Sequence, residues 1–222
     1  MIASFSRGLV FVKTRKVGGT SLEIVLSSWC SGEDICSPIP PEDERIRQAL
    51  GGAPRNFAAP DGTTKFYNHM PATEIQAALP ELWADAFKFS LERHPYEKVV
   101  SRAWWNVGRK GGLNKLALLW GRRETISAEI EKVIQDRSYL NFELYTKDRK
   151  LLVDEVWPHH EMNDRLAKLA RRLGVPTPSA LPRAKGGYRK DTRPAREVLT
   201  KDQRDQIYEG AAFEFELMGY DR

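Results

Sequence analysis

A lysine, two glycines and two hydroxyl side chains lie close together near the start of the chain and could bind an anion. They form the segment Lys16-Val17-Gly18-Gly19-Thr20-Ser21, just after the apolar run Leu9–Val12. The apolar run predicts a short buried strand, and the residues after Ser21 predict a helix capped by Thr20 or Ser21. The first N–H groups of a helix and its dipole favour an anion at such a turn. Lys16 could contact a phosphate or sulfate oxygen there.

The order of these residues separates the segment from the common nucleotide-binding loop. A Walker A loop places its lysine after the last glycine, in the pattern G-x-x-x-x-G-K-[ST]. Here Lys16 comes two residues before Gly18. This order argues against an ordinary nucleotide triphosphatase. An ordinary strand-to-helix connection with a surface lysine remains open as the alternative.

A second basic residue stands at a similar junction later in the chain. The segment 86–92 alternates apolar and polar residues as a strand does, and Pro95 suits the first turn of the next helix. Arg93 lies between them and could grip a phosphate with its planar guanidinium, while Ser101 on the helix could donate from its hydroxyl. The alternative is an arginine that pairs with a carboxylate for structural reasons.

The elements that must position these residues predict an α/β fold with a mainly parallel central sheet flanked by helices. Strand candidates at 9–12, 86–92 and 151–157 alternate with amphipathic helices. Ligands of such folds bind at the carboxyl ends of the strands, which is where Lys16 and Arg93 stand. We expect a single domain over 1–222, with 31–65 as a loop or flap insertion that contains a short helix at 42–50.

Local signals predict the ends of several elements. Thr73 followed by Gln76 is a capping-box pattern, and Pro80 is expected to interrupt the helix that Thr73 begins. The residues 65–69 resemble the end of a short strand. A last helix is predicted to start from the capping pair Thr200 and Gln203 and to end near Gly219.

Composition indicates a globular chain without a membrane span. The 222 residues are 41% hydrophobic and 29% charged, with a net charge of +5. No apolar run is long enough to cross a bilayer or to act as a secretion signal, so we expect a cytoplasmic protein. Cys30 and Cys36 are expected to be buried or idle thiols. Basic residues cluster at 108–124 and 181–196, and the simplest interpretation of each cluster is solvated surface.

The two junctions together resemble the nucleotide-binding motifs of the carbohydrate-type sulfotransferases, the group that includes heparan 2-O-sulfotransferase. The first motif of that family reads Pro-Lys-Thr-Gly-Gly-Thr-Ser, and here Arg15 replaces the proline and Val17 the threonine. The second often reads Arg-Asp-Pro-Tyr-Glu-Arg-Leu-Val-Ser, and here His94 replaces the aspartate. The resemblance extends in outline over most of the chain and implies a P-loop-like three-layer fold.

The resemblance also implies a donor, 3′-phosphoadenosine 5′-phosphosulfate, and the residues that bind it. Its 3′-phosphate would be held by Arg93 and Ser101, and a basic loop near the C-terminus would close over the nucleotide. The residues expected at the 5′-phosphosulfate are Arg15, Lys16, Gly18, Gly19, Thr20 and Ser21, and those of the closing loop are Lys185, Gly186, Tyr188 and Arg189.

Sulfuryl transfer requires two catalytic roles that residues of this chain can fill. Charge builds on the leaving oxygen, and the ammonium of Lys16 suits its stabilisation. A general base must take the proton of the attacking hydroxyl, and His69 is our choice because its segment is similar to the family's histidine-bearing stretch before a helix. A loop histidine with a structural hydrogen bond is the alternative for His69, and Glu92 is a second candidate base. We expect no metal, because His159 and His160 are adjacent and would point to opposite faces of a strand.

Two other functions are weighed against sulfuryl transfer. A P-loop-like small-molecule kinase would need an acidic metal-binding residue and a lysine after the glycines. A nucleic-acid-binding module would use the two basic clusters but would leave both strand-to-helix junctions unexplained. We therefore expect a nucleotide donor and a hydroxyl-bearing acceptor, a glycan or glycosylated metabolite, with no nucleic acid. Trp104, Trp105 and Trp120 could stack on sugar rings or simply pack.

Overall fold

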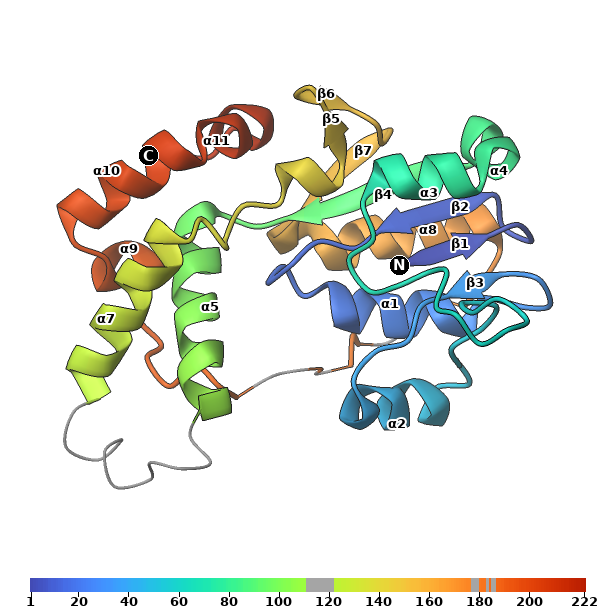
Figure 1. Cartoon of the computed structure of the whole chain (residues 1–222), viewed down its shortest axis with the longest axis horizontal. Helices are drawn as coiled ribbons and strands as arrows, with labels where there is room; N and C mark the ends of the chain where they lie inside the picture. Colours follow the sequence, from blue (N-terminus) through green and yellow to red (C-terminus); the bar gives the residue numbers. More distant parts are fainter. Residues whose placement is uncertain (111–121, 177–179, 183, 185–186) are drawn as a thin grey trace. The chain divides into compact units, whose positions relative to one another are not determined.

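The chain forms two compact units, each built from two stretches of sequence. The computed structural model describes residues 1–110, 122–176, 180–182, 184 and 187–222. Unit 1 consists of Met1–Glu92 with Asn141–Lys185, and unit 2 of Arg93–Leu140 with Gly186–Arg222. Unit 1 contains the sheet, and the described helices of unit 2 pack around a core of their own (Figure 1).

A mixed five-stranded sheet forms the centre of unit 1. Its order is β3 (Ile35–Cys36), β1 (Ile2–Ser4), β2 (Leu9–Val12), β4 (Phe87–Glu92) and β7 (Glu155–Pro158). The pairs β2–β4 and β4–β7 are parallel, whereas β1 pairs antiparallel with both β2 and β3. The predicted α/β class is confirmed, and the sheet is parallel in its centre rather than throughout. The short turn between β1 and β2 explains the difference, because a tight hairpin can join only antiparallel strands.

Two helices cover one face of this sheet with apolar side chains. Helix α1 (Gly19–Ser28) and helix α8 (Met162–Leu173) share a core with the inward residues of β2, β4 and β7 (Figure 1). Within that core Phe89 stacks between Phe11 and Trp157, with ring centroids 5.1 Å and 4.0 Å away. The three parallel strands are thereby fixed to one another by aromatic contacts as well as by their ladder.

The remaining elements of unit 1 are short. They are the helices α2 (Pro41–Ala49), α3 (Ala72–Ala78) and α4 (Pro80–Asp85), the 3-10 turns η1 (Phe142–Leu144) and η2 (His159–Glu161), and the hairpin β5 (Thr146–Lys147) with β6 (Lys150–Leu151). The helix predicted at 42–50 is confirmed by α2, and the predicted break at Pro80 separates α3 from α4.

Two local predictions for unit 1 were wrong. Helix α3 begins at Ala72 after Pro71, with no side-chain cap, so Thr73 lies inside its first turn rather than capping it. The residues 65–69 contain no strand; Asn68 and His69 form a turn, and His69 has a φ of 62°. A proline before the helix replaces the hydroxyl cap, because its fixed φ already sets the direction in which the chain enters the helix.

Unit 2 is helical in its described residues. Its helices are α5 (Pro95–Lys110), α7 (Arg122–Gln135), α9 (Ala195–Val198), α10 (Lys201–Gly210) and α11 (Ala212–Met218). Their apolar sides meet in one core that includes Val99, Ile130 and Phe215. The predicted capping box at Thr200 and Gln203 is confirmed, with both of its hydrogen bonds present. Both cysteines, which lie in unit 1, are buried as predicted.

The part of the chain that the structure describes has no helix both long enough and apolar enough to cross a bilayer.

Candidate functional site

The candidate site of unit 1 lies where the parallel strands end. Val12 at the end of β2 pairs with Ser90, and Glu92 at the end of β4 pairs with Pro158 of β7, so the three strands finish at one edge. The hydroxyl of Thr14 donates to the carbonyl of Leu91 at 2.5 Å and anchors the segment after β2 to β4. The segment 13–18 therefore starts from a fixed point at the edge where α/β folds bind ligands.

Backbone conformation shapes the loop between β2 and α1. Gly18 is the N-cap residue of α1 and has a φ of 79°, and Lys16 also has a positive φ, of 63°. A Cβ on Gly19 would lie 3.2 Å from Cγ of Lys13, so this second glycine lets the Lys13 side chain pass close to the backbone. Val17 is fully buried, whereas Lys16 and Arg15 are partly exposed. The buried side chain of Val17 anchors the loop, and the side chains of Arg15 and Lys16 remain partly exposed to solvent.

Thr20 and Ser21 lie inside the first turn of α1 instead of capping it. Gly18 takes the cap position without a side-chain hydrogen bond, so the predicted hydroxyl cap was wrong. Both hydroxyl residues are buried, and Oγ of Ser21 accepts a hydrogen bond from the amide of Ala184 at 3.4 Å. A glycine that adopts the left-handed conformation at no steric cost explains why no hydroxyl is needed at the cap. The hydroxyls and the first-turn amides stay next to Lys16 in sequence, as an anion site requires.

Asn141 holds the loop and was not singled out from the sequence. Its Oδ1 accepts from the amide of Arg15 at 3.0 Å, and its Nδ2 donates to the carbonyl of Arg15 at 2.9 Å. Glu92 lies beside it, fully buried, and accepts from the hydroxyl of Tyr145 at 3.1 Å. Glu92 is thus enclosed in a hydrogen-bonded support of the loop, which disfavours it as a catalytic base. A single asparagine 126 positions after Arg15 gives no signal in the sequence.

His159 lies next to Gly18 of the glycine loop. It follows β7 in η2, and a Cβ on Gly18 would lie 3.3 Å from its Nε2 and 3.5 Å from Cε of Met162. The sequence interpretation considered His159 only as a metal ligand. The signal that could have found it is its position directly after a strand that ends at the same sheet edge.

Because His159 lies so close to Gly18, we predict that Gly18→Ala destabilises unit 1 by more than the cost of placing an alanine at a positive φ. Gly51 is a matched control, since it has the same φ of 79° but no atom within 4 Å of the position that a Cβ would take. Gly51→Ala should cost roughly 1–2 kcal/mol, the usual penalty for an alanine in the left-handed region. Gly18→Ala should lower the free energy of unfolding in urea by more, and the same change made in His159→Ala and compared with His159→Ala alone should cost about as much as Gly51→Ala. Equal losses in the two single variants would contradict the contact.

His69, the predicted base, is next to the start of the same loop. Its Nδ1 is 3.1 Å from the main-chain oxygen of Lys13. Burial and the ammonium of Lys13 are the main causes that lower the pKa of His69 to about 3, against a weaker opposite effect of this hydrogen bond. The ring is therefore neutral at physiological pH, which is the state that a proton acceptor needs.

Unit 2 contains the other predicted cluster, organised around Glu97. Its Oε2 accepts from Nη2 of Arg93 at 3.0 Å and from Nη1 of Arg189 at 2.6 Å, while Oε1 accepts from the amide of Ala195 at 2.9 Å. Burial alone would raise the pKa of Glu97, but the Ala195 amide and the two guanidinium groups lower it below its ordinary value. The structure therefore brings Arg93 and Arg189 together, and Glu97, which sequence reasoning missed, joins them.

The other predicted nucleotide-binding residues of unit 2 lie on α5 or beside it. Ser101 is half-buried on α5, about two helical turns after Arg93. Tyr188 packs against the same helix, because a Cβ on Gly108 would overlap its ring. His94 packs among Tyr96, Phe215 and Tyr220, which indicates a structural residue. Lys185 and Gly186 lie outside the described residues, as does Trp120.

Comparison of the chain with protein-family models, with curated proteins and with solved structures found no match.

Proposed function

We propose that this protein is a sulfotransferase that moves a sulfuryl group from 3′-phosphoadenosine 5′-phosphosulfate to a hydroxyl of a glycan or a glycosylated small molecule. The observation that carries the proposal is the loop after β2. There Lys16 precedes the left-handed Gly18, and the first turn of α1 presents its amides at the carboxyl edge of a parallel sheet.

The residues of each unit suit one end of this donor. In unit 1, Lys16, Arg15 and the amides that begin α1 would hold the 5′-phosphosulfate, and the two glycines leave the backbone open for a close approach. In unit 2, Arg93 and Arg189 bring two guanidinium groups to the same carboxylate, Glu97, and the planar guanidinium group suits binding of the 3′-phosphate. Ser101 and Tyr188 are further candidates at the nucleotide.

The chemistry assigned to the chain is an in-line displacement at sulfur. The hydroxyl oxygen of the acceptor forms a bond to sulfur while the bond from sulfur to the bridging phosphate oxygen breaks. The products are a sulfate ester and adenosine 3′,5′-bisphosphate. Lys16 would stabilise the charge on the departing oxygen, and Nε2 of His69 would take the hydroxyl proton.

Ligand-dependent melting tests the choice of donor. At a concentration of 100 times its Kd, adenosine 3′,5′-bisphosphate should add about 2.7 kcal/mol of stability, which for a chain of this size corresponds to roughly 5–10 °C in Tm. Arg93→Ala should reduce this gain, since it removes one guanidinium while Glu97 keeps Arg189 and Ala195 as partners. Lys201→Ala, which changes an exposed lysine of the same unit, should leave the gain as it is.

ATP with magnesium is the comparison ligand. Stabilisation by ATP and magnesium but not by the bisphosphate would replace the proposal with a small-molecule kinase. If the bisphosphate stabilises the protein, transfer of labelled sulfur from the donor to a panel of hydroxylated acceptors identifies the acceptor class. Absence of transfer to all sugars and glycosides of the panel would contradict the acceptor part of the proposal.

A further inference from the structure

The hydrogen bond between His69 and Lys13 fixes which ring nitrogen carries the proton. A main-chain carbonyl can only accept, so Nδ1 of His69, 3.1 Å from the oxygen of Lys13, must be the donor. In a neutral ring the lone pair then lies on Nε2. A φ of 62° is uncommon for a residue with a side chain, and here it accompanies the ring's contact with the Lys13 carbonyl.

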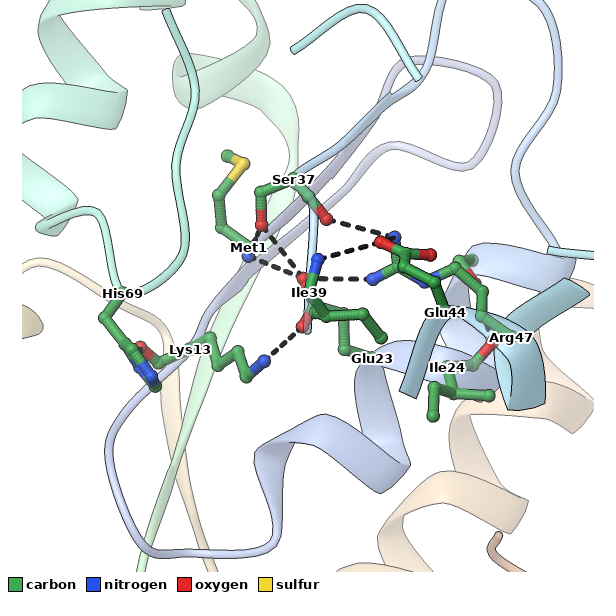
Figure 2. A network of polar contacts seen from close by, with 10 residues as sticks. Met1, Lys13, Glu23, Ile24, Ser37, Ile39, Glu44, Arg47 and His69 are labelled. Atoms are coloured by element: carbon green, nitrogen blue, oxygen red, sulfur yellow. Dashed lines mark hydrogen bonds and ion pairs between the residues drawn. The ribbon is translucent and has the colours of Figure 1, made fainter. Parts of the chain in front are cut away.

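The side chain of the same lysine runs into the interior of unit 1. Figure 2 shows His69 next to the main chain of Lys13, whose side chain extends away to Glu23. The side chains of Lys13 and Glu23 are only 1% and 0% exposed, and they form an ion pair. Gly19 lies against Cγ of Lys13 and so defines the path of this side chain beneath the loop.

Glu23 is a strong counter-charge because several donors converge on it. It accepts from the amino group of Met1 at 2.8 Å and from the hydroxyl of Ser37 at 3.0 Å, and Arg47 lies 3.6 Å away (Figure 2). The ammonium of Lys13 is therefore held in a buried place by a carboxylate that has other partners as well. This matters for variants, since Glu23 keeps Arg47 and the Met1 amino group as partners when Lys13 is replaced.

We propose that Lys13 is the positioning residue for His69: its carbonyl, 3.1 Å from Nδ1, keeps the proton on that nitrogen and so leaves the lone pair of Nε2 for the acceptor. This rests on the proposed function, in which Nε2 of His69 takes the proton of the acceptor. After burial, the Lys13 ammonium is the largest cause that lowers the pKa of His69, with smaller effects of the Met1 amino group and Arg15, and the Glu23 carboxylate paired with Lys13 carries the opposite charge. An anion bound at the loop offsets this positive field, so the ring gains basicity when the donor is in place.

Nitrogen-15 NMR of the histidine rings in the full-length chain tests the proposal without any assay of sulfuryl transfer. The chain has 4 histidines, and His69→Gln identifies the resonances of His69. The unchanged protein should show the proton of His69 on Nδ1. In Lys13→Met, which keeps an unbranched side chain as far as Cε but removes the ammonium, the pKa of His69 should rise by about one pH unit or more, because a nearby positive charge is gone.

Two further variants separate charge from packing. Lys13→Arg keeps the positive charge and should leave the titration of His69 unchanged. Lys88→Met removes a lysine of the same unit that pairs with the more exposed Asp154, and should also leave it unchanged.

A proton on Nε2 of His69, or an identical titration in folded Lys13→Met, overturns the proposal. The tautomer is read in the unchanged protein, so this part is decided even where a variant does not fold. Failure of sulfuryl transfer with the expected NMR result would refute the proposed function and leave the link between Lys13 and His69 intact.

Discussion

Lys16→Ala is expected to lower the kcat of sulfuryl transfer by about 10²–10³-fold, the usual cost of removing one preorganised group that stabilises developing charge. Lys16 is partly exposed and belongs to a loop whose fixed points are Thr14, Arg15 and Val17, so its removal should leave folding intact. The effect should fall on kcat more than on the KM of the donor, because charge on the leaving oxygen exists only in the transition state.

The measurement is transfer of labelled sulfur at saturating donor, with unfolding curves for both proteins. Lys150→Ala removes an exposed lysine of strand β6 in unit 1 and should keep full activity. Transfer by Lys16→Ala within a few-fold of the unchanged protein would remove Lys16 from the mechanism.

Glu23→Gln is expected to cost about 3–5 kcal/mol of folding free energy, as when one partner of a buried ion pair is removed. The change leaves Lys13, Arg47 and the Met1 amino group in the interior without their shared carboxylate. Glu155→Gln is the control, since its pair with Arg165 is 36–44% exposed and should be worth less than about 1 kcal/mol. Denaturant unfolding followed by circular dichroism measures both losses, and equal losses would contradict a special role for the buried cluster.

The same carboxylate predicts how stability depends on pH. Burial alone would raise the pKa of Glu23, but Lys13, the Met1 amino group and Arg47 outweigh it and lower the pKa from 4.5 to about 2. A lowered carboxyl pKa stabilises the fold above pH 4.5, and this contribution of about 3 kcal/mol is lost as the pH falls from 4.5 towards 2. The difference between the unchanged protein and Glu23→Gln should therefore shrink over that interval.

The sequence predicts those parts of the fold that depend on neighbouring residues. The apolar run at 9–12, the alternation at 86–92 and the glycine at 219 lie where periodicity and helix-end chemistry place them. Strand β1 was missed, because three buried residues are too few to show a period. The hydroxyl caps expected at Thr20 and Thr73 were wrong, since Gly18 and Pro71, each two positions earlier, occupy the cap positions and set the helix entry.

The candidate site could be predicted only in its local motifs. Lys16, Gly18 and Arg93 were found because each follows a recognisable strand. Asn141, Glu97 and His159 hold or contact those residues, but they come from other strands or loops and have no pattern of their own. Such support becomes visible only when the chain is folded, because its partners are distant in the sequence.

The order of the strands has a consequence for synthesis on the ribosome. Strand β4 lies between β2 and β7, yet β7 is translated only after the whole stretch Arg93–Leu140 of unit 2. A nascent chain that has just completed β4 can pair it with β2 alone, and its other edge keeps unpaired N–H and C=O groups until Glu155–Pro158 has emerged. Throughout that interval the growing polypeptide carries an open, largely apolar strand edge, the feature that chaperones recognise and that favours aggregation.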